Sequence, residues 1–213
     1  MQVKNVFFDL DGTLIDSSQG IFASINYAMK KLNHPLLSQE LLKTFVGPPL
    51  LDSFIRIGFS NEKAIEAVQY YRENYHRVGM YQVKPYPEIE KVLSNLSATH
   101  HLYLATSKPE YFAVKILQHL NFATFFSGIY GADLEGKLAK KADIIHYALT
   151  TESILATDTL MVGDREYDMI GASENGIAGL GVLYGFGDKK ELMDSGAICT
   201  VEWPIDLLKV LEK

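Results

Sequence analysis

The sequence is poor in cysteine, because Cys199 is the only one among its 213 residues. A single cysteine can form neither an internal disulfide nor a cysteine-based zinc site, and it fits a reducing compartment. No apolar stretch approaches the roughly 18 residues of a membrane span. The first residues, Met1 to Lys4, show neither the long apolar run nor the cleavage site of a signal peptide. We therefore expect a cytoplasmic protein that does not insert into a membrane.

An excess of positive charge is also lacking. The chain carries 20 Lys and Arg residues against 26 Asp and Glu residues, for a formal net charge of -6. A broad basic face for nucleic acid is therefore not expected. An anionic ligand would have to be held by a few local cations and a metal ion. Apolar residues make up 47% of the chain and charged residues 22%, as in ordinary globular proteins.

Two phosphate-binding motifs are missing as well. No GxxxxGK followed by Ser or Thr occurs, which argues against an ATP-driven kinase of the P-loop type. The glycine pairs at 179/181 and 185/187 lack the third glycine and the following helix of a dinucleotide-binding fingerprint. The six histidines show no metal-ligand spacing. The chemistry must therefore come from other residues.

What the sequence does contain is an alternation of short apolar strands and amphipathic helices. The expected strands are Val3–Phe8, His101–Ala105, Ser127–Tyr130, Thr159–Val162, Gly179–Leu183 and Ile198–Val201. The expected helices in the same part are Glu88–Leu96, one from Pro109, Ala142–Thr150 and one from Pro204. Such alternation implies right-handed crossovers and a mostly parallel sheet covered on both faces. The sequence therefore predicts a three-layer, Rossmann-like α/β core.

Residues 14–80 interrupt this alternation, because they show only helical periodicity and no strand. Ile21, Ile25 and Ala28 repeat at helical spacing, and a second periodic segment follows Asn61. Between these segments, Phe45–Leu50 (FVGPPL) must be a loop, since consecutive prolines cannot continue a helix. We expect a catalytic core of residues 1–13 and 81–213, with a helical cap of residues 14–80 inserted after the first strand.

Polar groups follow three of the expected strands. The clusters are Asp9 to Thr13 (DLDGT), Thr106 to Lys108 (TSK), and Gly163-Asp164 with Asp168 beyond. In a parallel sheet the carboxyl ends of the strands lie at one edge, where ligands bind near the point at which the strand order reverses. The three clusters therefore predict one site.

The acidic residues of this site favour a magnesium ion (Mg2+). Asp9 and Asp11 are two residues apart, so in an extended chain they point to the same side. Two close carboxylates resist ionisation unless a cation sits between them, and Asp164 completes a pocket of oxygen ligands, which suits magnesium rather than zinc. Gly12 allows a sharp turn, and Thr13 offers a hydroxyl to hold the second carboxylate; Thr13 is also a candidate substrate-binding residue.

These residue types match the needs of phosphate-ester hydrolysis. A carboxylate that attacks a phosphoryl group must be screened by a metal and by cations. A neighbouring carboxyl group can protonate the leaving alkoxide and later take a proton from water. Thr106 and the backbone amides after it, beginning with Ser107, can donate to phosphate oxygens at the start of the helix near Pro109. Among the lysines of GKLAKK, Lys141 is favoured because it directly precedes a helix, and Lys140 remains the alternative.

Taken together, these motifs resemble those of the haloacid dehalogenase superfamily, in its phosphatase branch. Phe7 to Leu14 (FFDLDGTL) resembles the first motif, Thr106 to Pro109 the second, Lys141 the third, and Gly163 to Asp168 the fourth. The helical insertion resembles the cap between the first and second motifs, so that the resemblance covers nearly the whole chain.

The resemblance implies a role for each matching residue. Asp9 would be the nucleophile and a metal ligand, and Asp11 the general acid and base, with its backbone carbonyl on the metal. Thr106 and Lys141 would hold the transferring phosphoryl group. Asp164 would complete the metal site, with Asp168 supporting it by orienting a metal-bound water or Lys141. The family's dehalogenases and phosphonate hydrolases lack an acid at the position of Asp11, which argues against both chemistries.

Within the superfamily, the chain is most similar to bacterial phosphoglycolate-phosphatase-like and 5'-nucleotidase-like hydrolases. The segment FVGPPL resembles the cap loop of that subgroup, which closes over the leaving group. Gly47 and Pro48 are therefore substrate-contact candidates, and a simple interhelix turn is the alternative. Arg56 and Arg72 could reach a second anionic group of the substrate, although an exposed surface position is the plainer expectation.

The expected activity is that of a magnesium-dependent phosphomonoesterase acting on a small phosphate ester such as phosphoglycolate or a nucleoside 5'-monophosphate. Monomer and homodimer are both compatible with it. A sugar phosphomutase or a pyrophosphatase could use the same core, although the cap shows no His-Lys pair suited to a mutase. A non-enzymatic phospho-ligand-binding protein is a further alternative, which the complete set of side chains disfavours.

Overall fold

The computed structural model describes residues 3–134 and 138–211. Gly136 and Lys137, at the start of the lysine-rich segment, lie outside the described residues. Contacts divide the chain into two compact units. The core unit comprises Met1–Asp16 and Pro85–Lys213, and the helical unit comprises Ser17–Lys84. The expected domain boundaries, 13/14 and 80/81, lie close to these positions.

The core unit contains a six-stranded sheet with the strand order β5-β4-β1-β6-β7-β8. Its neighbouring strands all pair in parallel. The strand bounds are β1 Asn5–Phe8, β4 His101–Pro109, β5 Gly128–Ala132, β6 Thr159–Gly163, β7 Ala178–Val182 and β8 Ala197–Val201. All four residues of β1 are buried, as expected of a central strand covered on both faces. The strand order reverses at β1, which places its carboxyl end at the topological switch point.

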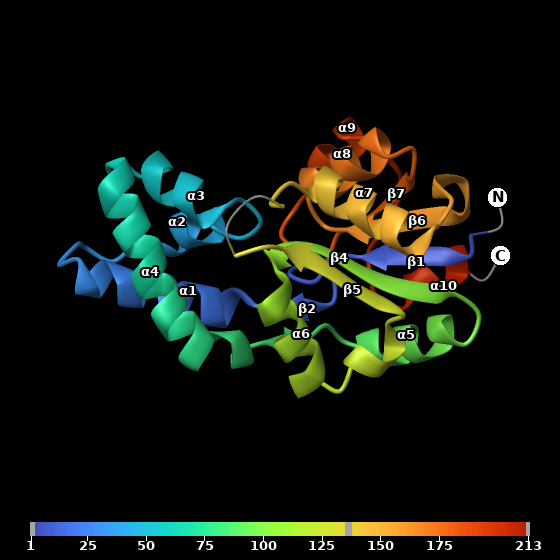
Figure 1. Cartoon of the computed structure of the whole chain (residues 1–213), viewed down its shortest axis with the longest axis horizontal. Helices are drawn as coiled ribbons and strands as arrows, with labels where there is room; N and C mark the ends of the chain where they lie inside the picture. Colours follow the sequence, from blue (N-terminus) through green and yellow to red (C-terminus); the bar gives the residue numbers. More distant parts are fainter. Residues whose placement is uncertain (1–2, 135–137, 212–213) are drawn as a thin grey trace. The chain divides into compact units, whose positions relative to one another are not determined.

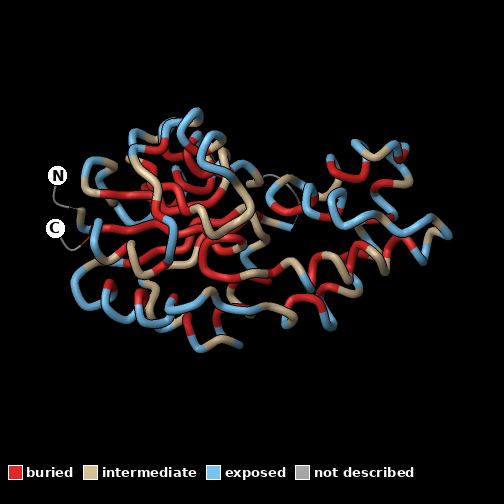
Figure 2. The backbone as a smooth tube through the Cα atoms, turned by 180° about the vertical axis from the view of Figure 1, so that it is seen from behind, coloured by how far each residue is buried: buried red, intermediate tan, exposed pale blue. Residues whose placement is uncertain are grey.

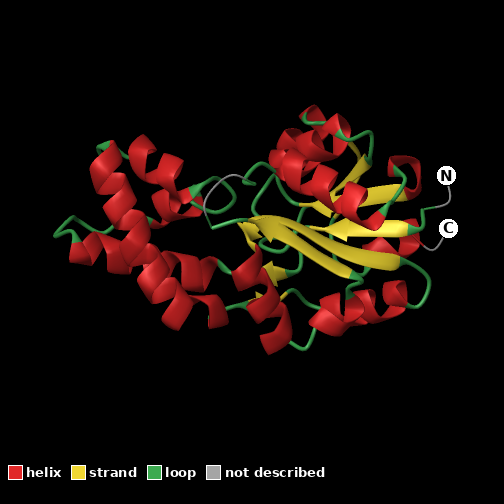
Figure 3. Ribbon diagram, viewed as in Figure 1, coloured by secondary structure: helices red, strands yellow, loops and turns green. Residues whose placement is uncertain are grey.

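Helices cover both faces of this sheet (Figure 1). The helices α5 (Ile89–Ser97) and α6 (Glu110–His119) lie on one face. On the other face lie α7 (Lys141–Glu152), α8 (Glu166–Glu174) and α9 (Lys189–Asp194). The last helix, α10 (Asp206–Leu211), contacts α5. Figure 3 shows the sheet between the two helical layers. The expected three-layer α/β core is therefore confirmed.

The packing beneath α7 fixes the two elements that carry the site. Phe7 of β1 and Met161 of β6 are neighbours in the sheet, and both belong to the same buried cluster as Ile144 and Ile145 of α7. Each of these side chains is fully buried, and each contributes about 1.5–3 kcal/mol through burial. Figure 2 shows buried segments running through the interior of the core unit. The end of β1 and the start of α7 are thereby held in place.

The helical unit consists of α1 (Ser18–Lys31), α2 (Gln39–Lys43), α3 (Leu50–Arg56), α4 (Asn61–Arg77) and a 3-10 turn at Gly79–Tyr81. The two long helices pack against each other, burying Ile21 and Ile25 of α1 and Ala67 and Tyr71 of α4. Ser60 caps α4 by accepting a hydrogen bond from the Lys63 amide. None of the described helices combines the length and apolar character needed to cross a membrane.

Several sequence-based expectations need correction. Residues 14–80 are not free of strand, because β2 (Ile15–Asp16) pairs with β3 (Lys84–Pro85) in a separate two-stranded sheet. Strands of two residues are too short to show a period. The strand expected to end at Ala105 continues to Pro109, and α6 begins at Glu110 because Pro109 is extended, with ψ 128°. The helices α2, α3, α8 and α9 were not predicted, since each is short and offers few periodic positions.

Candidate active site

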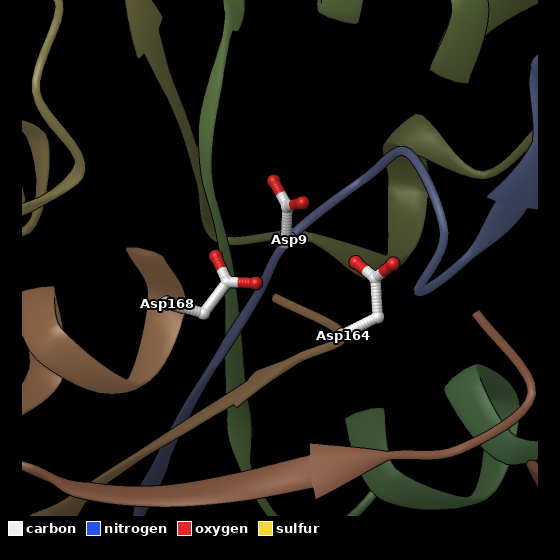
Figure 4. A group of neighbouring side chains, drawn as sticks. All are labelled: Asp9, Asp164 and Asp168. Atoms are coloured by element: carbon white, nitrogen blue, oxygen red, sulfur yellow. The ribbon is translucent and has the colours of Figure 1, made fainter. Parts of the chain in front are cut away.

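Three carboxylates converge at the carboxyl ends of the central strands. Asp9 directly follows β1, and its amide donates to the Val162 carbonyl at 3.0 Å, which continues the pairing with β6. Asp164 directly follows β6, and Asp168 lies in the first turn of α8. All three residues are buried, and one carboxylate oxygen from each lies within 4.8 Å of those of the others. Figure 4 shows the three carboxylates close together, with Asp168 projecting from the start of a helix.

Lys141 joins two of these carboxylates. Its Nζ atom lies 2.7 Å from Asp9 Oδ1 and 2.7 Å from Asp168 Oδ1, and it donates to the Ala105 carbonyl at 2.9 Å. Burial lowers the pKa of Lys141, but the charges of Asp168 and Asp9 outweigh this effect and hold the pKa above its usual range. The ammonium group is therefore charged and fixed beside Asp9.

Asp164 is the most enclosed member of the cluster. Its Oδ2 atom accepts from the Phe186 amide at 2.8 Å, and its Oδ1 atom accepts from the Thr13 hydroxyl at 3.3 Å. Burial, followed by the charges of Asp168 and Asp9, raises the pKa of this carboxyl well above its usual value. A nearby cation would stabilise the ionised form of such a buried carboxyl group. Thr13 thus holds Asp164, whereas the sequence led us to expect it on Asp11; Gly12, with φ 87°, turns the chain between them.

Asp168 is held between the backbone at the start of α8 and the Lys141 ammonium group. Its Oδ2 atom accepts from the Arg165 amide at 3.1 Å, while Oδ1 contacts Lys141. Burial raises the pKa of Asp168 to about 6, against the lowering effect of Lys141. Among the described residues, the clustered carboxylates are those of Asp9, Asp164 and Asp168.

The side chain of Asp11 is paired with a different lysine. Lys108 Nζ lies 2.6 Å from Asp11 Oδ2, and the two side chains are only 7% and 15% exposed, respectively. The other oxygen, Asp11 Oδ1, is buried and has no hydrogen-bond partner. Thr106 is buried beside this pair, where its hydroxyl accepts from the Lys108 amide at 3.3 Å, and Ser107 is half-buried. The sequence offered no role for Lys108.

A glycine-rich loop that sequence reasoning missed closes over the back of Asp164. Tyr184 donates its hydroxyl to the Thr13 carbonyl at 3.1 Å, and Phe186 supplies the amide described above. A Cβ atom on Gly185 would lie 2.4 Å from Asp164 Cβ, so only glycine allows this approach. The two glycines at 185 and 187 were the available signal. A glycine pair of this kind can indicate close backbone contact as well as a dinucleotide fingerprint.

The arrangement matches a known family along most of the chain. A family model described as haloacid dehalogenase-like hydrolase matches residues 6–182, a segment that includes every site residue from Asp9 to Asp168. The chain belongs to the haloacid dehalogenase-like hydrolase family. The expected family is thereby confirmed.

Several relatives of this hydrolase carry functional names. A 5'-nucleotidase of Pseudomonas aeruginosa is 41% identical over 194 residues, covering 90% of this chain and 88% of the relative. A Mycobacterium tuberculosis protein named tyrosine-protein kinase PtkA is 36% identical over 183 residues, 85% of this chain but only 62% of the relative. A phosphoglycolate phosphatase of Neisseria gonorrhoeae is 30% identical over 199 residues, 87% of this chain and 82% of the relative.

Solved structures agree with this assignment. The crystal structure titled a predicted phosphatase from Clostridium acetobutylicum superimposes with a TM-score of 0.94 at 42% identity, covering 100% of both chains. The general class expected from the sequence, an enzyme of the phosphatase type in this family, is thereby confirmed. The substrates named for individual relatives belong to those relatives.

The remaining predicted residues of this haloacid dehalogenase-like hydrolase lie outside the carboxylate cluster. Lys140 is exposed at the N-cap of α7. In the helical unit, Gly47 (φ 103°) is exposed and Pro48 is half-buried, both in the loop between α2 and α3. Arg56 donates to the Thr44 carbonyl at 2.7 Å and to its hydroxyl at 2.9 Å, which ties α3 to the start of this loop. Arg72 is exposed on α4.

Proposed function

We propose that the protein is a magnesium-dependent phosphomonoesterase that hydrolyses a small phosphorylated metabolite through an aspartyl-phosphate on Asp9. The observation that carries this proposal is the position of the Asp9 carboxylate, with the Lys141 ammonium at 2.7 Å and the carboxylates of Asp164 and Asp168 close by. A carboxylate held between a cation and a cation-binding group is the arrangement that an attack on phosphate requires.

The donor set fits magnesium. The clustered carboxylates of Asp9, Asp164 and Asp168 face one ammonium group, that of Lys141, and three negative charges less one positive charge leave two. A divalent cation restores the balance, and oxygen ligands are those that magnesium prefers. Asp9 and Asp164 would hold it together with the Asp11 backbone carbonyl, and Asp168 would support them. When bound, the ion draws charge from the phosphoryl oxygens and screens the approach of Asp9.

The first step forms the phosphoenzyme. Lys141, the Thr106 hydroxyl and the Ser107 amide hold the phosphoryl oxygens, and Thr13 keeps Asp164 in place. Because Asp9 Oδ1 accepts from Lys141, we assign the attack to Oδ2. A bond forms between this oxygen and phosphorus while the bond from phosphorus to the ester oxygen breaks. The Asp11 carboxyl gives its proton to the leaving alkoxide.

The second step regenerates the enzyme. Asp11, now a carboxylate, takes a proton from a water molecule as the water oxygen attacks phosphorus. The bond between phosphorus and Asp9 breaks, so that inorganic phosphate leaves and both aspartates return to their starting protonation states. One residue thus serves as acid in the first step and as base in the second.

The substrate is a small phosphate ester. The names of the relatives favour a nucleoside 5'-monophosphate or phosphoglycolate as starting points. Gly47 and Pro48 in the helical unit are the proposed contacts to the leaving group. We place the reaction in the cytoplasm and expect a monomer or homodimer.

A second candidate is phosphoryl transfer to an acceptor other than water. The name of the mycobacterial relative, a tyrosine-protein kinase, supports this second candidate. The same aspartyl-phosphate would serve a mutase or a kinase, and the difference lies in the group that receives the phosphoryl.

Phosphate release from a panel of phosphometabolites, with magnesium and with EDTA, tests the proposal. Hydrolysis predicts magnesium-dependent release of phosphate from at least one ester, in a 1:1 ratio to the alcohol. Transfer predicts less phosphate than alcohol when an acceptor is added. Absence of turnover across the panel, or full turnover by Asp9→Asn, would overturn the assignment.

A further inference from the structure

Lys108 has no part in the steps described so far, yet it is buried at the site. Its side chain is only 7% exposed, and its Nζ atom lies 2.6 Å from Asp11 Oδ2. A buried ammonium group is costly unless it is paired and hydrogen-bonded. Asp11 provides this pairing, so the two side chains fix each other.

The pairing treats the two oxygens of Asp11 differently. Oδ2 accepts from Lys108, whereas Oδ1 is buried with no hydrogen-bond partner. A buried acceptor without a partner is unfavourable, so the site maintains an unsatisfied oxygen at the residue for which proton exchange is proposed. Oδ1 is thus the oxygen of Asp11 whose hydrogen-bonding capacity is unused.

We propose that Lys108 is a positioning residue that holds Asp11 by Oδ2 so that Oδ1 alone exchanges the proton. The inference rests on the acid and base role proposed for Asp11. Oδ2 can accept from Lys108 in both protonation states, because a carboxyl group protonated on Oδ1 keeps a carbonyl oxygen at Oδ2. In the first step the proton passes from Oδ1 to the leaving alkoxide as the ester bond breaks. In the second it passes from water to Oδ1 as the bond from phosphorus to Asp9 breaks.

The backbone around Lys108 is itself fixed. The Lys108 amide donates to the Thr106 hydroxyl at 3.3 Å, and the pairing of β4 with β5 shifts register between Thr106 and Pro109. A Cβ atom on Gly131 of β5 would lie 2.7 Å from the Lys108 carbonyl oxygen, so the two strands approach closely here. The end of β4 thus places both a phosphate-holding hydroxyl and the lysine that orients Asp11.

The test compares Lys108→Met with Lys108→Arg, and uses Lys91→Met on α5, where the lysine is 63% exposed, as the matched control. Rapid-quench measurement of alcohol release isolates the first step, on p-nitrophenyl phosphate and on an alkyl phosphate substrate. p-Nitrophenolate leaves without a proton, but an alkoxide needs one. We expect Lys108→Met to slow release of the alkyl alcohol at least about ten-fold more than release of p-nitrophenol, with an unchanged KM. Lys108→Arg should restore part of the rate, and Lys91→Met should match the wild type.

Two results would overturn the inference. Equal losses on both esters would mean that Lys108 only maintains the structure. A raised KM with unchanged rates would mean that Lys108 binds substrate. Circular dichroism and thermal melting of each variant check the fold, and Lys108→Arg provides the comparison if the methionine variant is unstable.

Asp11→Asn separates this inference from the function on which it rests. If Asp11→Asn shows the alkyl-selective loss and Lys108→Met does not, the positioning role fails and the acid role of Asp11 stands. If Asp11→Asn shows no such selectivity, both fail. If both variants show it, the double variant should lose no more selectivity than Asp11→Asn alone, because the two residues act as one unit.

Discussion

Lys141 Nζ and Asp9 Oδ1 are 2.7 Å apart, although the two residues are separated by 132 positions in the chain. The contact depends on packing far below it, because α7 carries Lys141 and is anchored through Ile144 and Ile145 to the same cluster that holds β1. Asp168 lies on the other side of the ammonium group at 2.7 Å. The proposed nucleophile is therefore positioned by a lysine that is itself fixed from two sides.

A pair of adjacent lysines tests which one serves the reaction. Lys141→Met should lower kcat by about 10²–10³, because the buried cation beside Asp9 and the transferring phosphoryl group is lost. Lys140→Met should leave kcat within about two-fold, since Lys140 is exposed at the N-cap. Steady-state kinetics on one substrate decide the matter. Equal losses in the two variants, or a loss confined to Lys140→Met, would contradict the assignment.

Asp164→Asn should raise the magnesium concentration needed for half-maximal activity by about 10- to 100-fold or more, because one anionic ligand is removed. Asp158→Asn is the matched control. Asp158 directly precedes β6, whereas Asp164 directly follows it, and Asp158 forms an ion pair with Lys4. Magnesium titration of the EDTA-treated proteins provides the measurement. An unchanged requirement in Asp164→Asn would count against its role as a ligand.

Gly185→Ala should weaken magnesium binding without altering any acidic residue. The added methyl group would overlap Asp164 Cβ, at 2.4 Å, and displace the carboxylate from the cluster. Gly196→Ala provides the control: its φ of 101° strains any side chain, but no atom lies within 4 Å of its Cβ position. We expect the control to lower the melting temperature and to leave the magnesium requirement as in the wild type. A normal requirement in Gly185→Ala would show that the loop does not support the site.

Arg56→Met should raise KM while the magnesium requirement stays constant. The guanidinium group holds Thr44 at the start of the loop that contains Gly47 and Pro48, so its loss should loosen the proposed leaving-group contacts. Arg72→Met, a change at an exposed position of α4, provides the control. Identical KM values in wild type and Arg56→Met would remove the loop from the account of substrate binding.

The sequence predicted the sheet and the location of the site because strands and their polar ends are local features. The apolar run before Asp9 and the one before Asp164 identified two central strands, and their carboxyl ends had to meet at one edge. The order of the strands and the two-residue strands β2 and β3 depend on long-range pairing. Such pairing leaves no periodic pattern in the local sequence, so neither feature could be predicted from it. The short helices α2, α3 and α9 were missed for a related reason, since five to seven residues hardly display a period.

Contacts within the site were harder to predict than its membership. The Thr13 hydroxyl donates to Asp164 rather than to Asp11, and Asp11 forms an ion pair with Lys108. The reason is the turn at Gly12, which directs neighbouring side chains to different partners. The support that Phe186 gives to Asp164 comes from a backbone amide, which carries no side-chain signature in the sequence. Residue types indicated a candidate chemistry, and the fold shows which side chain contacts which.

Chemical trapping of the phosphoenzyme tests the central claim most directly. The enzyme is mixed with substrate and magnesium, quenched in acid during turnover and reduced with borohydride, which converts an aspartyl-phosphate to homoserine. Peptide mass spectrometry then locates the modified residue. Our account predicts homoserine at position 9, at higher yield in Asp11→Asn if loss of the base slows hydrolysis more than phosphorylation, and none in Asp9→Asn. Turnover without any modification at Asp9, or with homoserine at another aspartate, would contradict it.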